Sequence, residues 1–248
     1  MKSVDLNADL GEGASTDGTL LRVITSANIA CGGHAGDEVS MRKAVAAAIT
    51  HGVGIGAHPS FPDREGFGRR AMTLTPRMLI ETLAEQIRGL AIIAEQAGAA
   101  MAHVKAHGAL YNAAVDSDEV AAAIGQAIRL VNLDLIGVAL AGSRMASVFR
   151  DLGLRVAEEA FIDRGYTTSG ALVARSDPRA LITDPVQAAA RAVRMMQHGV
   201  VESVDGVPLR VRADTLCVHS DSPGSPQLAA AARRGLEEAG FTVTRMSG

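Results

Sequence analysis

The chain has 248 residues, of which 48% are hydrophobic and 21% charged, a composition typical of a soluble globular protein. The length suits one large α/β domain or two small ones. The net charge of −3 provides no basic stripe for phosphates and argues against a nucleic-acid partner. We find neither a signal-peptide core nor an apolar run long enough to span a membrane, and the two cysteines lack metal-type spacing, so we expect a cytoplasmic protein with reduced thiols and no membrane partner.

Short apolar runs alternate with longer amphipathic stretches along the whole chain, which is the pattern of a parallel sheet or barrel. Strands are predicted near 2–9, 24–31, 53–58, 102–107, 134–140, 154–159 and 214–219, with a short last strand near 241–245. Helices are predicted near 37–51, 75–97, 117–131, 142–151, 185–198 and 225–239. Two long connections, 59–74 and roughly 160–183, are typical of lids or binding loops, and the first is the candidate lid.

Histidine and carboxylate side chains gather just past the ends of these predicted strands. Parallel strands place their carboxyl ends on one side of a sheet or barrel, and ligands bind there. We therefore expect one pocket supplied by five or six strand ends. Its members would be Asp9, Glu12, His34, His58, His107 and His219.

The first strand carries a polar face, because Asp5, Asn7 and Asp9 alternate with apolar residues. Such a face points either into a barrel or to a solvated sheet edge. Glycines on both sides of Glu12 allow tight turns and close backbone approach, which favours the interior.

The second cluster lies between Ser26 and Asp37 and includes Asn28. Gly32 and Gly33 could turn successive N–H groups toward an anion, although a histidine beside a glycine pair, here His34, is often only a turn residue. Cys31 is interpreted as a buried structural thiol rather than a nucleophile, because nothing beside it in the sequence would lower its pKa.

The third cluster has His103, Lys105 and His107 on one face of a predicted strand. A lysine within a strand is costly to bury unless it meets a carboxylate or an anionic ligand. We weigh a salt bridge from Lys105 to Asp5 or Asp9 against a role in substrate binding, and both can hold together.

Later acids and bases are weaker signals when each is taken alone. Glu158-Glu159 and Asp163-Arg164 could be acid/base groups or ion pairs that anchor a loop. We find no P-loop, dinucleotide fingerprint, nucleophile elbow or zinc-protease helix in the sequence. The histidines and carboxylates could hold a divalent metal, but their ligands would come from separate strands and no spacing rule tests this.

At these clusters the chain resembles the 5-oxoprolinase A-subunit family, long labelled lactam-utilisation proteins (LamB/YcsF). The resemblance spans essentially the whole chain. It rests on Asp5 to Gly13, Ser26 to Asp37, Gly56 to Arg70, Val104 to Asn112, Glu159 to Tyr166 and Cys217 to Asp221. Ala106 stands where the family usually has proline, and Ser220 where it has glycine, which leaves the backbone path beside His107 open.

The resemblance implies an irregular seven-stranded β/α barrel of the glycoside hydrolase/deacetylase type, as a single domain over residues 1–248. It also implies ATP-dependent opening of the lactam 5-oxo-L-proline to L-glutamate, carried out together with partner subunits B and C. The ATP site is expected on this chain or shared with a partner subunit.

For this reaction we expect five catalytic residues. A carboxylate of the pair Asp9 and Glu12 would be the general base, His58 and His107 would transfer protons, and Lys105 would stabilise negative charge. Arg69 and Arg70 on the candidate lid would meet phosphate or the substrate carboxylate. The remaining expected substrate-binding residues are Asn7, Asn28, Gly33, His34, Arg64, Tyr111, Glu159, Asp163, Arg164 and His219.

Two other functions stay open from the sequence. One is an ATP-independent, metal-dependent amidohydrolase or deacetylase built on Asp9, His34 and His58. The other is a non-catalytic subunit that presents substrate to an enzyme elsewhere.

Overall fold

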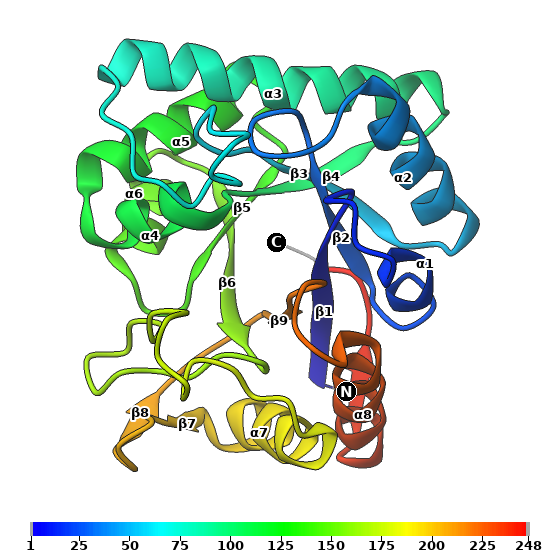
Figure 1. Cartoon of the computed structure of the whole chain (residues 1–248), viewed down its shortest axis with the longest axis vertical. Helices are drawn as coiled ribbons and strands as arrows, with labels where there is room; N and C mark the ends of the chain where they lie inside the picture. The colour runs from blue at the N-terminus through cyan, green and yellow to red at the C-terminus, as the bar shows by residue number, and fades with distance from the viewer. Residues whose placement is uncertain (1, 247–248) are drawn as a thin grey trace.

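Seven parallel strands close into a barrel in the computed structural model, which describes residues 2–246 (Figure 1). The strands follow one another around the barrel, and the last pairs with the first. They are β1 (Lys2–Leu10), β2 (Ser26–Ala30), β3 (Gly54–His58), β4 (Met101–Lys105), β5 (Ile136–Leu140), β6 (Arg155–Phe161) and β9 (Thr215–Val218). The expected seven-stranded β/α barrel is therefore confirmed.

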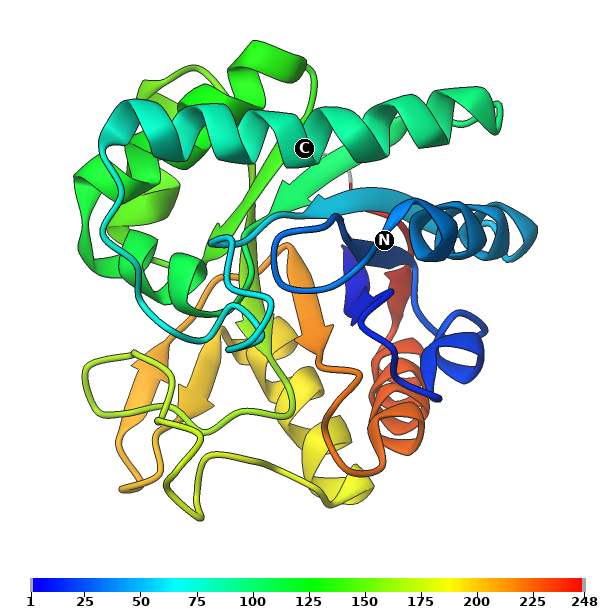
Figure 2. The same ribbon diagram turned by 45° about the horizontal axis from the view of Figure 1, so that its top comes forward.

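Helices surround the barrel on the outside, as two views of the ribbon show (Figures 1 and 2). They are α1 (Asp17–Leu20), α2 (Glu38–Thr50), α3 (Pro76–Gln96), α4 (Gly108–Asp116), α5 (Asp118–Val131), α6 (Arg144–Asp151), α7 (Pro185–His198) and α8 (Ser225–Glu238). The side chains of Thr75 and Asp184 cap α3 and α7 ahead of a proline, as this sequence pattern predicts.

Every strand and helix predicted from the sequence is present, including the short last strand near 241–245, and a few other short elements were not predicted. β10 (Phe241–Val243) pairs with the first residues of β1 outside the barrel. A small hairpin of β7 (Val200–Glu202) and β8 (Pro208–Arg210), together with α1 and α4, was missed.

The predicted strand over 102–107 is wrong at its end. β4 stops at Lys105, and His107 is the N-terminal cap residue of α4. His107 therefore does not share a strand face with Lys105, and its backbone N–H instead donates to the carbonyl of Pro59 in the connection after β3.

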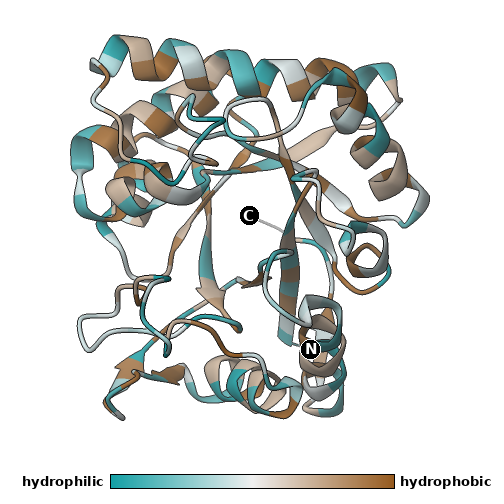
Figure 3. Ribbon diagram, viewed as in Figure 1, coloured by the Kyte–Doolittle hydropathy of each residue, from teal (hydrophilic) through white to brown (hydrophobic). Residues whose placement is uncertain are grey.

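The polar face of β1 points into the barrel and not to a solvated edge. Asp5, Asn7 and Asp9 are all buried, and polar bands alternate with apolar ones along the barrel strands (Figure 3). Gly56 on β3 makes room for one member of this interior, because a Cβ atom there would lie 2.0 Å from Nε2 of the buried His103. The barrel core is therefore partly a hydrogen-bonded polar network.

The two long connections contain no helix or named strand, as expected. The connection 59–74 crosses the carboxyl ends of the strands and is held by backbone bonds to α4, including one from the N–H of Ala109 to the carbonyl of Gly68. The connection 162–184 forms only two isolated bridges. Within residues 2–246 we find no helix long and apolar enough to cross a membrane.

Candidate active site

A cavity of about 310 Å3 opens at the carboxyl ends of the strands. Its wall combines ends of β1, β3, β4 and β6 with both long connections. The polar lining residues are Asp9, His58, Arg69, Lys105, His107, Tyr111, Asn112, Arg164, Arg175 and His219. Of the six residues expected to share one pocket, Asp9, His58, His107 and His219 line this cavity, whereas Glu12 and His34 do not.

Lys105 is the cation at the centre of this site. Its Nζ lies 3.0 Å from Oδ1 of Asp9, 3.0 Å from Oε1 of Glu159 and 3.0 Å from Sγ of Cys217, and its side chain is 3% exposed. The salt bridge to Asp9 anticipated from the sequence is therefore present. Lys105 also lines the cavity, so the ion pair and contact with a ligand are compatible.

The buried pair carries opposite charges, as the pKa shifts of both partners indicate. Burial alone would raise the pKa of Asp9, but His58 and Lys105 outweigh burial and hold this pKa well below its usual range. Burial opposes the charge of Lys105 too, but Asp9, Cys217 and Glu159 keep its pKa well above the usual value. Asp9 is thus an ionised acceptor beside an ammonium group, at the cavity wall.

Asn7 and Asn28 orient this pair from inside the barrel and do not line the cavity. Nδ2 of Asn28 donates to Oδ1 of Asp9 and to Oδ1 of Asn7, each at 2.8 Å. Nδ2 of Asn7 donates to Oε1 of Glu159 at 3.0 Å. The two amides are positioning residues in this geometry rather than groups that touch a ligand.

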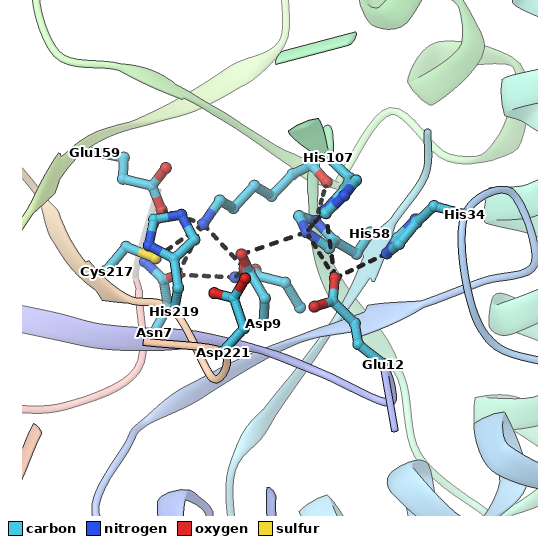
Figure 4. Close-up of polar contacts among 12 residues, drawn as sticks. Asn7, Asp9, Glu12, His34, His58, His107, Glu159, Cys217, His219 and Asp221 are labelled. Carbon is cyan, nitrogen blue, oxygen red and sulfur yellow. Dashed lines mark hydrogen bonds and ion pairs between the residues drawn. The ribbon is translucent and has the colours of Figure 1, made fainter. Parts of the chain in front are cut away.

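Three histidines surround Glu12 at the ends of β1 to β4 (Figure 4). Oε1 of Glu12 lies 2.8 Å from Nε2 of His34, 3.3 Å from Nδ1 of His107 and 3.8 Å from Nε2 of His58. The rings of His34 and His107 stack with centroids 3.6 Å apart. We call these four residues the Glu12 cluster, and their side chains could hold a metal ion.

The three histidines differ in their affinity for a proton. Burial, with a contribution from His58, lowers the pKa of both His34 and His107 to about 3. Burial would lower the pKa of His58 as well, but the nearby Asp9 and Glu12 outweigh it and raise this pKa. Two of the three rings are therefore neutral at physiological pH.

His219 lies on the opposite side of Asp9 from the Glu12 cluster (Figure 4) and forms a hydrogen-bonded pair with Asp163. Nδ1 of His219 lies 3.0 Å from Oδ2 of Asp163, and this carboxylate also accepts from the hydroxyl of Ser222 at 2.6 Å. Burial opposes the charge of Asp163, but His219 outweighs it and lowers the pKa of Asp163. Because Nδ1 is engaged, Nε2 is the ring nitrogen left for a ligand in the cavity.

Arginines flank the mouth of the cavity. Arg69 from connection 59–74 and Arg175 from connection 162–184 both bind the carboxylate of Asp221, at 2.6 and 3.0 Å. Arg164 lines the cavity too, although its guanidinium also donates to the carbonyls of Val173 and Ala180. Guanidinium groups in this position suit a carboxylate or phosphate ligand.

His34, Glu159 and Asp163 were predicted to bind substrate but contact lining residues without lining the cavity themselves, and three further predicted residues lie away from its wall. Arg64 donates to the carbonyls of Gly32 and Gly36, and Arg70 lies near Asp63 and Glu65 at the surface. Gly33 packs against Ser60 and Gln86, where a Cβ atom would lie 2.4 Å from each side chain. Their predicted contact with substrate has no counterpart in this geometry, because each has a structural task of its own.

Other expected members do reach the site. Tyr111 lines the cavity, and its hydroxyl and Oε2 of the nearby Glu159 are both buried without a hydrogen-bond partner among the described residues. Arg175 and Asn112 were not singled out from the sequence. For Arg175 the only available signal was its place in the long connection that also carries Asp163 and Arg164.

Comparisons with known proteins agree along the whole chain. The model of the LamB/YcsF family matches residues 4–248. A protein of Bordetella pertussis that is named as the A subunit of 5-oxoprolinase is 47% identical over 246 residues, which are 97% of this chain and 98% of the relative.

Solved structures extend this similarity to three dimensions. A lactam utilization protein from Thermus thermophilus has a TM-score of 0.92 at 44% identity, covering 99% of this chain and 100% of the other. The catalytic domain of a peptidoglycan N-acetylglucosamine deacetylase from Eubacterium rectale, at 12% identity, shares only the fold, with a TM-score of 0.52 over 99% of this chain and 89% of that one. The chain therefore belongs to the LamB/YcsF family.

Proposed function

We propose that this chain is the A subunit of an ATP-dependent 5-oxoprolinase, which opens 5-oxo-L-proline to L-glutamate together with subunits B and C. The observation that carries the proposal is the buried Lys105 ammonium beside the ionised Asp9 at the cavity wall. The name of the relative from Bordetella pertussis, 47% identical over nearly all of both chains, supports the substrate.

The reaction is difficult because the lactam is an unstrained, resonance-stabilised amide. Phosphoryl transfer from ATP to the carbonyl oxygen would produce a better electrophile. Water then attacks the same carbon to give a tetrahedral intermediate, and the C–N bond breaks to leave an acyl phosphate on the opened chain. A second water molecule hydrolyses this acyl phosphate to L-glutamate and inorganic phosphate. We place ATP on this chain or on a site shared with a partner subunit.

Asp9 accepts the proton of the attacking water in this proposal, because it is ionised and lines the cavity. Lys105 stabilises the negative charge that develops on the substrate oxygen. Asn28 donates a hydrogen bond to Asp9, and Asn7 donates one to Glu159. These bonds hold the two carboxylates beside Lys105 in place, so no side chain has to rearrange.

His219 donates a proton to the leaving nitrogen. We prefer it over His58 and His107 because the free ring nitrogens of those two face Glu12 and each other, whereas His219 offers Nε2 to the cavity. The buried Asp163 fixes the tautomer and the ring orientation of His219.

Arg69 and Arg175 receive the carboxylate of 5-oxoproline in exchange for Asp221. Both guanidinium groups are partly exposed at the cavity mouth, so the exchange does not require a buried charge to move. Their positions on two different connections let one anionic group join both.

One assay tests the proposal: release of glutamate from 5-oxo-L-proline by the purified chain with subunits B and C, with ATP present or omitted. We expect glutamate only when ATP and all three subunits are present. Turnover by this chain alone without ATP would replace the proposal with an ATP-independent amide hydrolase. Full turnover by B and C alone would reduce this chain to a non-catalytic role.

A further inference from the structure

The Glu12 cluster has a geometry that differs from an ordinary buried ion pair. Glu12, His34, His58 and His107 each offer one nitrogen or oxygen atom, and these four atoms all lie within 4.8 Å of one another. The three histidines are buried and come from three different strand ends. One carboxylate oxygen faces three imidazole nitrogens.

Hydrogen bonds on the far sides of two rings determine where their protons lie. Nδ1 of His58 lies 2.8 Å from the carbonyl oxygen of Lys105, and Nε2 of His107 lies 2.9 Å from the carbonyl oxygen of Phe67. A carbonyl can only accept, so both of these nitrogens carry hydrogen. Nε2 of His58 and Nδ1 of His107 lie 3.0 Å apart, so their lone pairs would face each other if both rings were neutral.

Two facing lone pairs are repulsive unless a cation or a proton lies between them or beside them. The same orientation is typical of metal-binding histidines, whose second nitrogen donates to a carbonyl or carboxylate. The surrounding charge favours a cation, because the largely buried carboxylates of Asp9, Glu12 and Glu159 have only Lys105 as a fixed positive partner within this group.

The connection 59–74 packs against these rings at the carboxyl ends of the strands. Gly68 has φ +64, and a Cβ atom on it would lie 2.8 Å from Cδ2 of His107 and 2.9 Å from Cβ of His34. The neighbouring Phe67 also has a positive φ, 55°, and presents its carbonyl to His107. The backbone of this loop is fitted closely against the rings.

We propose that the Glu12 cluster is a site for one divalent transition-metal ion, bound by Glu12, His34, His58 and His107. Three imidazoles and one carboxylate suit Zn²⁺, Co²⁺ or Mn²⁺ better than Mg²⁺ or Ca²⁺, which prefer oxygen ligands. The site borders the reaction cavity, because His58 and His107 line it and Oδ2 of Asp9 lies 3.4 Å from Nε2 of His58.

A second group of metal-type side chains, Asp9, Cys217 and His219, is less suitable. Nζ of Lys105 lies 3.0 Å from Sγ of Cys217 and 3.0 Å from Oδ1 of Asp9, so a metal ion there would meet an ammonium group. The Glu12 cluster contains no such cation.

The test measures metal content and does not depend on the proposed reaction. The full-length chain is stripped with a chelator, dialysed, and titrated separately with Zn²⁺, Co²⁺, Mn²⁺ and Mg²⁺, and bound metal is measured by mass spectrometry. We expect one transition-metal ion per chain, a rise in the thermal midpoint on binding, and a visible absorption spectrum of bound Co²⁺ with nitrogen and oxygen ligands.

Glu12→Gln and His58→Ala are compared with His51→Ala, which changes an exposed histidine outside the cluster. We expect each cluster variant to weaken metal binding by about tenfold or more, and the control to bind like the wild type. His107→Asn replaces His58→Ala if that variant does not fold by circular dichroism.

Several results would overturn the proposal that the Glu12 cluster binds a metal ion. One is a wild-type chain that binds no transition metal after stripping, in which case His58 alone carries a proton between the rings. Others are binding that is unchanged in the cluster variants, and binding of Mg²⁺ with no preference for the transition metals. Because each readout is metal content, failure here is distinguishable from failure of the 5-oxoprolinase assay.

Discussion

Asp5 and Asp9 lie on the same face of β1, four positions apart, and their surroundings differ sharply. Asp5 accepts hydrogen bonds from the hydroxyls of Thr25, Ser26 and Thr215 at 2.8, 2.6 and 2.5 Å. Burial raises its pKa to about 6, despite these hydroxyls.

Asp9 instead meets Lys105 and His58, keeps a low pKa and lines the cavity. A buried acid in a barrel is therefore not by itself a sign of catalysis. The site lies where an ionised acid, a fixed cation and an open cavity coincide, at the carboxyl ends of the strands. Asp5, near the amino ends of the strands, is a buried acid of the same type that has only a structural role.

The largest effect is expected when Lys105, the cation that distinguishes the surroundings of Asp9 from those of Asp5, is removed. Lys105→Met leaves Glu159 as a buried acid without a cation and Asp9 with His58 as its remaining partner, so we expect turnover to fall on the order of a thousandfold and unfolding free energy to fall by about 3–5 kcal/mol. Turnover is measured with the partner subunits, and stability by urea unfolding.

The double variant Lys105→Met, Glu159→Gln separates the two effects. Neutralising Glu159 should return part of the stability, while turnover stays low because the cation is still missing. Recovery of turnover together with stability would show that Lys105 serves only the fold.

His219 tests whether the pair on the other side of Asp9 takes part in chemistry. His219→Asn keeps a polar side chain but removes the proton donor, so we expect turnover to fall on the order of a hundredfold. Stability should fall as well, because His219 is only 15% exposed and pairs with the buried carboxylate of Asp163. His51→Asn is the matched control. Equal turnover in the two variants would remove His219 from the mechanism.

Arg175 and Arg70 compare an arginine at the cavity mouth with one at the surface. We expect Arg175→Gln to raise KM for 5-oxoproline about tenfold, because a charge-assisted hydrogen bond contributes about 1.5–3 kcal/mol, and to change kcat less. Arg70→Gln should leave both constants near the wild-type values. An equal rise in KM for both variants would contradict the carboxylate assignment.

Asp5→Asn has the smallest expected effect on turnover, because Asp5 affects stability alone. Its folded pKa of about 6 exceeds the ordinary 3.8, so the stability it contributes is full below about pH 4 and is lost as pH rises toward 6. Relative to Asp5→Asn, the wild type should therefore lose about 1.4 kcal/mol for each pH unit across this window, and nothing more above it. Urea unfolding at several pH values measures the difference, and a flat difference would show that the pKa of Asp5 is not raised.

The sequence predicted the barrel strands well because each is a short apolar run between turns, and the strand ends located most of the cavity. It missed α4 because that helix begins at Gly108, which has φ +53, and has no side-chain cap. The resulting error placed His107 in a strand.

Contacts between elements that are distant in the sequence could not be predicted from the sequence. Arg64 resembles Arg69 in the sequence, yet only the folded loop directs one to backbone carbonyls and the other to the cavity. Likewise, the 3.0 Å approach of His58 and His107 depends on the packing of loop 59–74.

The central claim is that chemistry belongs to the Asp9 end of the barrel and structure to the Asp5 end. Its most direct test is glutamate release by Asp9→Asn and Asp5→Asn in the same assay with ATP and the partner subunits, on preparations shown to be folded. We predict a loss on the order of a hundredfold or more for Asp9→Asn and turnover near the wild-type value for Asp5→Asn. Equal turnover in the two variants would contradict the account.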